Sequence, residues 1–97
     1  MAKTGDATTQ LPHGWREEKG RLKATYKFRD FQGAMSFLVE VAFQAEVNEH
    51  HPDFTVHWNE VQFEVWSHDE NRVTERDHNL VAQIAKIADR HGAKLAK

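Results

Sequence analysis

Residues 21–31 read RLKATYKFRDF, and inside this stretch the apolar pattern changes from that of a strand to that of a helix. Up to Arg29, apolar side chains alternate with charged or hydroxyl side chains, which is typical of a half-buried strand. From Phe31 to about Asn48 apolar residues recur at helical spacing, and Asp30 is a suitable N-cap. The apolar positions of this predicted helix are Phe31, Ala34, Met35, Leu38, Val41, Ala42 and Ala45.

Similar patterns continue on both sides of this stretch. Upstream, Trp15 to Lys19 forms a short predicted strand with Gly20 as the turn. Downstream, Pro52 ends the helix, because it pushes the preceding residue out of helical geometry. The remaining predicted elements are strands over residues 54–58 and 61–65, joined by a hairpin at Asn59-Glu60, and a helix from Thr74 to near Gly92.

The element order ββαββα predicts a two-layer α+β domain. We expect a four-stranded antiparallel sheet with both amphipathic helices packed on one face. The other face is expected to carry Lys23, Thr25, Lys27, Gln62, Glu64 and one apolar residue, Trp66. Residues 1–12 lack periodicity and are interpreted as a flexible N-terminal tail, and residues 13–97 as a single domain.

Composition restricts the classes of function. The net charge of -2 argues against a nucleic-acid-binding surface, because neutralising phosphates needs a basic excess. No apolar run approaches the ~20 residues that span a bilayer, so no membrane association is expected. Cysteine is absent, which excludes disulfides and cysteine-based zinc sites and fits a cytoplasmic location.

Histidine is the residue type that points to chemistry. Five of the seven histidines lie between His50 and His78, and two of them form the helix-to-strand corner EHHP at residues 49–52. In a sheet built from hairpins, the start of the third strand and the end of the fourth lie at one edge. This topology places His68 near the His50-His51 corner, with Asp77 in the first turn of the closing helix.

Clustered imidazoles are suited to acid-base catalysis. Their unperturbed pKa of ~6.5 lies close to working pH, so one ring can be charged while another is neutral. That pairing serves an elimination, in which one group protonates a departing hydroxyl and another removes a proton from a neighbouring nitrogen. Each element also has a simpler interpretation: a solvated loop at His50-His51, a polar turn at His68, and a capping box closed by Asp77. Trp15, Trp58 and the phenylalanines are interpreted as core residues.

The ordered set of motifs resembles the pterin-4a-carbinolamine dehydratases. The resemblance is carried by Ala45-Glu46-Val47-Asn48-Glu49-His50-His51-Pro52, Asn59, Val61, Ser67-His68 and Glu75-Arg76-Asp77, and by the strand-to-helix entry Phe28-Arg29-Asp30-Phe31. It covers about residues 14–88. Two positions depart from the family pattern: Phe54 stands where Trp is frequent, and Val56 stands in place of Asn.

The resemblance implies a hydro-lyase of tetrahydrobiopterin recycling, which removes water from 4a-hydroxytetrahydrobiopterin to give the quinonoid dihydropterin. It implies no metal or organic cofactor. The implied catalytic residues are His50, His51 and His68, supported by Asp77, with Glu49, Pro52, Phe54 and Ser67 contacting the pterin. It further implies a homodimer or homotetramer and a functional link to an aromatic amino acid hydroxylase. A transcriptional role, found in some animal members, is not carried over.

Two rival functions remain open at this stage. Histidines 50, 51, 57, 68 and 78 offer enough nitrogens for a zinc or copper site, although adjacent histidines rarely chelate one ion well. Alternatively, the domain is a non-catalytic dimerisation or interaction module. The complete set of histidines counts against that second rival, because a scaffold does not require them together.

Overall fold

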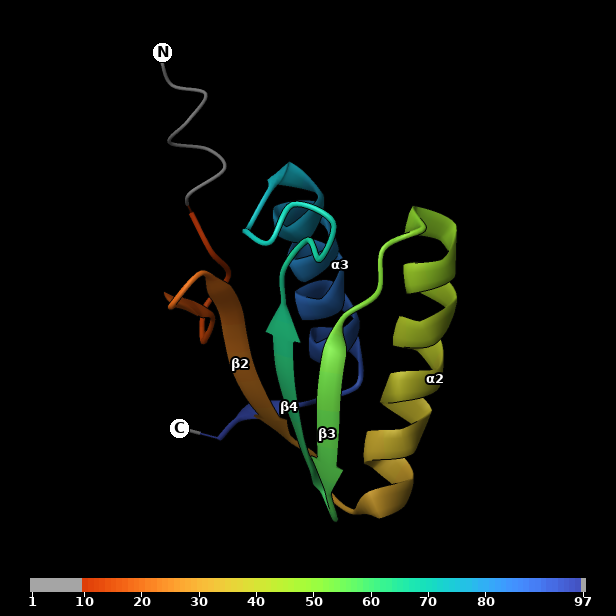
Figure 1. Ribbon diagram of the computed structural model, residues 1–97. Coiled ribbons are helices and arrows are strands. Elements are labelled where there is room, and N and C mark those ends of the chain that lie inside the picture. Colours follow the sequence, from red (N-terminus) through yellow and green to blue (C-terminus); the bar gives the residue numbers. More distant parts are fainter. Residues whose placement is uncertain (1–9, 97) are drawn as a thin grey trace.

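The computed structural model describes residues 10–96, in which two helices and five strands are found. In chain order they are β1 (Arg16–Glu18), β2 (Arg21–Lys27), α2 (Phe31–Asn48), β3 (Asp53–His57), β4 (Glu60–Val65), α3 (Glu75–Arg90) and β5 (Lys94–Leu95) (Figure 1). Most of the predicted tail, residues 1–9, lies outside the described residues. Within the rest of it, Leu11 already packs against the core. No helix in the described range is long and apolar enough to cross a membrane.

The strands form one antiparallel sheet in the order β1-β2-β4-β3. This arrangement confirms the predicted α+β class, with both helices on the same face of the sheet (Figure 1). The prediction of four strands was incomplete, because β5 pairs with the end of β2 at Tyr26 and Lys27. A strand of two residues is too short to show an alternation of apolar and polar side chains. It is recognised only by its pairing with β2.

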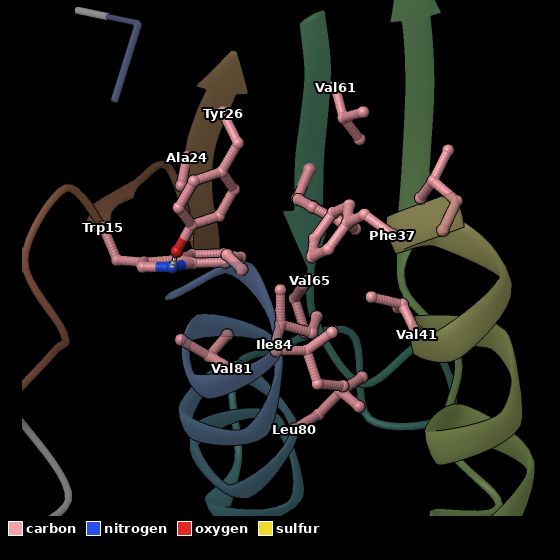
Figure 2. Packing of buried hydrophobic residues seen from close by; sticks show 14 of the residues in the cluster. Trp15, Ala24, Tyr26, Phe37, Val41, Val61, Val65, Leu80, Val81 and Ile84 are labelled. Atoms are coloured by element: carbon pink, nitrogen blue, oxygen red, sulfur yellow. Dashed lines mark hydrogen bonds between the residues drawn. The ribbon is translucent and has the colours of Figure 1, made fainter. Parts of the chain in front are cut away.

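The core lies between the helices and the inner face of β2 and β4 (Figure 2). Its largest fully buried side chains include Phe37 of α2, Phe63 of β4 and Leu80 and Ile84 of α3. The Trp15 Nε1–H donates a hydrogen bond of 2.7 Å to the Tyr26 hydroxyl, which satisfies the polar atoms of two buried aromatic residues. Hydrophobic burial on one sheet face therefore holds the two layers together.

Helix α2 begins at the predicted N-cap, and its C-terminal end is capped by a residue in the left-handed conformation. The Asp30 Oδ1 accepts a hydrogen bond of 2.8 Å from the Gly33 N–H. At the other end Glu49 takes a left-handed conformation, with φ 54° and ψ 40°. The predicted end at about Asn48 is confirmed, and the structure adds a left-handed cap three residues before Pro52. The left-handed residue also directs the chain into the histidine corner.

Both sides of α2 carry apolar side chains. The side facing the sheet holds Ala34, Phe37, Leu38, Val41 and Ala45. The exposed side holds Phe31, Met35, Val39, Phe43 and Val47. Of the apolar positions at helical spacing, Phe31, Met35 and Ala42 are exposed. The predicted core position of the phenylalanines is confirmed for Phe37, and it was wrong for Phe31, Phe43 and, on β3, Phe54. A helix that is apolar all round gives no reliable signal of which side faces the core.

The β3–β4 hairpin turns at Trp58 and Asn59, one residue before the predicted position. Trp58 has a φ of 54° and is 66% exposed, so the prediction of a core position was wrong for this residue. Asn59 is buried, and its Nδ2 donates to the Phe28 carbonyl over 2.9 Å. Its own carbonyl accepts from the Phe28 N–H over 2.8 Å. These two bonds fasten the hairpin to the end of β2.

The two helices are also joined through their polar residues. Glu40 of α2 accepts hydrogen bonds from Arg90, at the end of α3, and from His91, whose Nε2 lies 2.8 Å from the Glu40 Oε1. The hydrogen bond from Arg90, more than that from His91, holds the pKa of Glu40 below its ordinary value. The contact fixes the far end of α3 relative to α2.

Candidate active site

Four segment ends meet at one end of the molecule: the end of α2, the start of β3, the end of β4 and the start of α3 (Figure 1). At this junction His50 follows the left-handed Glu49 and is nearly buried, with 8% of its surface exposed. Its Nε2 lies 2.5 Å from the Oδ1 of Asp77, which is fully buried. A carboxylate can only accept, so His50 Nε2 carries the proton in this bond and Nδ1 is the basic nitrogen of the neutral ring.

Asp77 is the centre of a buried hydrogen-bond network. Besides His50, its carboxylate accepts from the Ser67 hydroxyl and from the Thr74 backbone N–H, each bond 2.8 Å to Oδ2. The bond from Thr74 is the predicted helix cap, and the bond from His50 is the contact that the predicted supporting role of Asp77 requires. One side chain therefore makes both contacts, because its two oxygens point toward different segments.

His51 and His68 are much more exposed than His50. The His51 Nε2 lies 2.7 Å from the Glu46 Oε2, and the His68 Nε2 lies 3.5 Å from the Asp53 Oδ2. Each of the three histidines therefore has one carboxylate nearby. Only the His50–Asp77 pair is buried, so the other two interactions are weakened by solvent.

The three histidines line one pocket of about 270 Å³. Its walls are Glu49, His50, His51, Asp53, Trp66, His68 and Asp69. The Asp69 side chain contributes a carboxylate to this wall, because a hydrogen bond from Arg76 lowers its pKa below the ordinary value. The pocket thus combines three imidazoles with acidic side chains and one large aromatic ring, a combination suited to moving protons on a bound heterocycle.

Some residues expected in the site are absent from this wall. Pro52 and Phe54 are not among the lining residues, and Ser67 has no exposed surface. Ser67 stands behind the pocket, where its hydroxyl orients Asp77. The substrate contact expected of Ser67 stays a prediction, and the contact that the structure gives its hydroxyl on this side is the bond to Asp77.

Three further residues line the pocket and were not predicted from the sequence: Asp53, Trp66 and Asp69. A signal existed for two of them. Asp53 directly follows the EHHP corner and Asp69 directly follows His68, so both were within reach of the predicted centre. Trp66 was noticed as the apolar residue of a polar sheet face, but face assignment alone does not show that a side chain reaches a pocket.

A larger hollow of about 650 Å³ lies beside α3 and β5 and is lined by Tyr26, Lys86 and Leu95 among others. None of the three clustered histidines lines it, so the chemistry favours the smaller pocket. Within residues 10–96, no group of three or more His, Cys, Asp or Glu side chains is arranged to hold a metal ion.

A family model described as pterin 4 alpha carbinolamine dehydratase matches residues 2–87. The chain belongs to this family. A protein of Thermomicrobium roseum, provisionally named a pterin-4-alpha-carbinolamine dehydratase, is 38% identical over 93 residues, which cover 91% of this chain and 99% of the relative. Relatedness to the pterin dehydratases therefore extends over nearly the whole chain.

Solved structures give the same assignment of fold. A crystal structure from Brucella melitensis, described as a transcriptional coactivator/pterin dehydratase, has a TM-score of 0.79 and 30% identity, covering 91% of this chain and 96% of that one. A pterin dehydratase-like protein, described as a RuBisCO assembly factor in the alpha-carboxysome, has a TM-score of 0.66 and 20% identity, covering 78% and 90%. At this lower identity the second likeness shows the fold alone.

Proposed function

We propose that the protein is a dehydratase that removes water from a 4a-hydroxytetrahydropterin, by histidine acid-base catalysis and without a metal. The observation that carries this proposal is the convergence of His50, His51 and His68 on one pocket, with His50 held by buried Asp77. Membership of the pterin dehydratase family supports the choice of substrate class.

The reaction needs one proton delivered and one removed. The C4a–O bond breaks as a protonated histidine gives its proton to the departing hydroxyl, which leaves as water. A neutral histidine takes the proton from the adjacent ring nitrogen, and the electron pair of that N–H bond forms the new C=N bond of the quinonoid product. Protons therefore balance within the pocket, and acid-base assistance of this kind supplies ~10²–10⁴-fold in rate.

We assign the proton transfers to His50 and His68, and the positioning of the pterin mainly to His51. For His50, the bond from Nε2–H to Asp77 leaves Nδ1 as the nitrogen that can accept a proton, and the carboxylate then stabilises the resulting imidazolium. The solvent exposure of His68 suits a group that exchanges protons with water between turnovers.

The test is the rate of dehydration of a 4a-hydroxytetrahydropterin generated in situ by a hydroxylase. We expect the wild-type protein to accelerate the reaction, and His51→Ala and His68→Ala to lose most of that acceleration while remaining folded, because both side chains are largely exposed. His57→Ala is the matched control, since His57 is an exposed histidine of β3 outside the pocket.

Equal loss in the His57→Ala control would show that the decrease does not come from the pocket. A folded wild-type protein that adds nothing to the uncatalysed rate would reject the dehydratase function. The non-catalytic interaction module would then be the better interpretation of the fold.

We also propose that the protein self-associates through the exposed side of α2. Its apolar residues 31, 35, 39, 43 and 47 recur every four positions and form one continuous ridge. A soluble monomer rarely exposes such a contiguous apolar surface. Because the ridge is self-complementary, a homodimer or homotetramer is the expected assembly. A cytoplasmic location and an aromatic amino acid hydroxylase as the source of substrate complete the proposal.

A further inference from the structure

Trp66 is stacked between two cationic or titratable side chains at the edge of the candidate pocket. The His68 ring lies with its centroid 4.0 Å from that of the Trp66 ring, and the two planes differ by 12°. The Arg21 Cζ lies 3.9 Å from the centroid of the same indole. Two planar groups this close to one ring would overlap if they shared a side. His68 and Arg21 therefore cover opposite faces of the indole.

The sheet register explains this three-layer stack. Val65, the last residue of β4, pairs with Leu22 of β2, so the next residue on each strand brings Trp66 beside Arg21. Strand residues two apart from each other share a face, and Trp66 therefore lies on the side of the sheet opposite the helices. The indole makes no contribution to the hydrophobic core, which lies on the helix side. A structural role in core packing consequently does not account for it.

His68 lacks the firm polar support that His50 has. Among the described residues its carboxylate neighbour is Asp53, which is exposed and lies 3.5 Å away, a distance too long for a strong hydrogen bond. The adjacent Asp69 is engaged by Arg76. The parallel stack on Trp66 is therefore the contact that fixes the plane of the His68 ring.

We propose that Trp66 is a positioning residue that holds the imidazole of His68 in its working orientation, with Arg21 bracing the indole from behind. The role in catalysis rests on the proposed dehydratase function. Because both indole faces are covered, Trp66 does not serve as a stacking platform for the pterin. A bound pterin meets His68 at the edge or the uncovered face of the imidazole.

The first test uses NMR of the histidine ring protons and needs no activity. In wild-type protein, the ring current of the indole moves the His68 ring protons upfield of those of exposed His57. Trp66→Leu abolishes that shift, and Trp66→Phe retains part of it. A His68 ring signal indistinguishable from that of His57 in wild-type protein would overturn the stack and with it the proposal.

The second test separates positioning from binding. We expect Trp66→Leu to lower kcat by about tenfold with little change in KM, because proton transfer depends on geometry to within about an ångström. Trp66→Phe, which keeps a flat ring, restores most of the rate, and Arg21→Gln gives an intermediate loss. Circular dichroism and the urea midpoint confirm that each variant is folded.

The outcomes distinguish this proposal from the function on which it rests. Inactive wild-type protein with an upfield His68 signal rejects the dehydratase function and leaves the stack intact. Active wild-type protein with unchanged kcat in Trp66→Leu rejects positioning by Trp66. If Trp66→Leu does not fold, Trp66→Phe and Arg21→Gln test the positioning role in its place. A wild-type kcat in Arg21→Gln, together with a change in KM alone in Trp66→Phe, would reject positioning.

Discussion

At the scale of single residues, Asp77 has the most demanding environment in the described part of the chain. It is fully buried, and its donors come from the histidine corner, from the segment after β4 and from its own helix cap. A buried carboxylate is tolerated only when its hydrogen bonds are satisfied, which is the case here. Its replacement therefore affects the site and the fold together.

For Asp77→Asn we expect kcat to fall by about a hundredfold or more, because the amide cannot stabilise a charged His50 as a carboxylate does. We also expect the free energy of unfolding to fall by about 2 kcal/mol, since charge-assisted bonds are lost. Urea titration and the dehydration rate measure the two effects. Asp89→Asn, an exposed change on the same helix, is the control and should alter neither. Full activity in Asp77→Asn would exclude the supporting role.

Tyr26 is the only tyrosine, and its ionisation can be followed by absorbance. Burial raises the pKa of its hydroxyl, despite the opposing effect of the hydrogen bond donated by Trp15. A raised pKa in the folded state means that stability is complete below the ordinary tyrosine pKa of about 10 and falls as pH rises above it. The urea midpoint of wild type should therefore fall as pH rises above about 10, and it should fall less over the same range in Tyr26→Phe. Equal slopes in both proteins would contradict this assignment.

At the scale of elements, the end of α2 shows a conflict between stability and site geometry. Glu49 holds the left-handed conformation that glycine adopts most easily, and it also lines the pocket. A residue chosen for helix capping alone would be glycine. The presence of glutamate at this position is consistent with a function for its carboxylate.

Replacing Glu49 by glycine is expected to raise the free energy of unfolding by about 1 kcal/mol, because the left-handed conformation no longer meets a Cβ. The same change should raise KM, since the pocket loses a wall carboxylate. Lys19→Gly is the matched control: Lys19 also has a positive φ of 52° but lies outside the pocket, so stability should rise with KM unchanged. Destabilisation by Glu49→Gly would contradict the capping argument.

The sequence predicts those elements whose signals are local. Asp30 at the N-cap and the alternation of Leu22, Ala24 and Tyr26 depend on neighbours a few residues away, so both could be predicted. The bond between His50 and Asp77 joins residues 27 positions apart. The sequence predicts that Asp77 lies near the histidines, but it does not show which histidine Asp77 binds. Likewise, the orientation of Trp66 depends on its register with β2, which a single sequence does not encode locally.

At the scale of the whole molecule, the unexplained surface is the apolar ridge of α2. Val39 is 52% exposed and Phe43 is 70% exposed, although both lie in a regular helix that packs on the core with its other side. Burying such side chains between two copies would stabilise an assembly by about 1.5–3 kcal/mol for each large residue. Self-association would bury these apolar side chains, which a domain of this size is too small to bury within itself.

The mass of the protein in solution tests this assembly. A chain of 11.3 kDa should sediment as a dimer or larger species, and Phe43→Glu should weaken association by about a hundredfold. Gln62→Glu adds the same charge to the opposite face of the sheet and should leave the mass unchanged. A wild-type protein that remains monomeric at high concentration would reject self-association through α2.

All residues that line the candidate pocket lie between Glu49 and Asp69, and Asp77 follows soon after. Among the described residues, neither residues 10–15 nor the two residues of β5 contribute a side chain to that wall. For protein engineering, this means that additions at either end of the chain do not alter the pocket wall, provided that Leu11 and β5 keep their contacts. A purification handle or a fluorescent domain attached at either end should leave ligand affinity unchanged, whereas an insertion in the loop that follows His68 would disrupt the pocket.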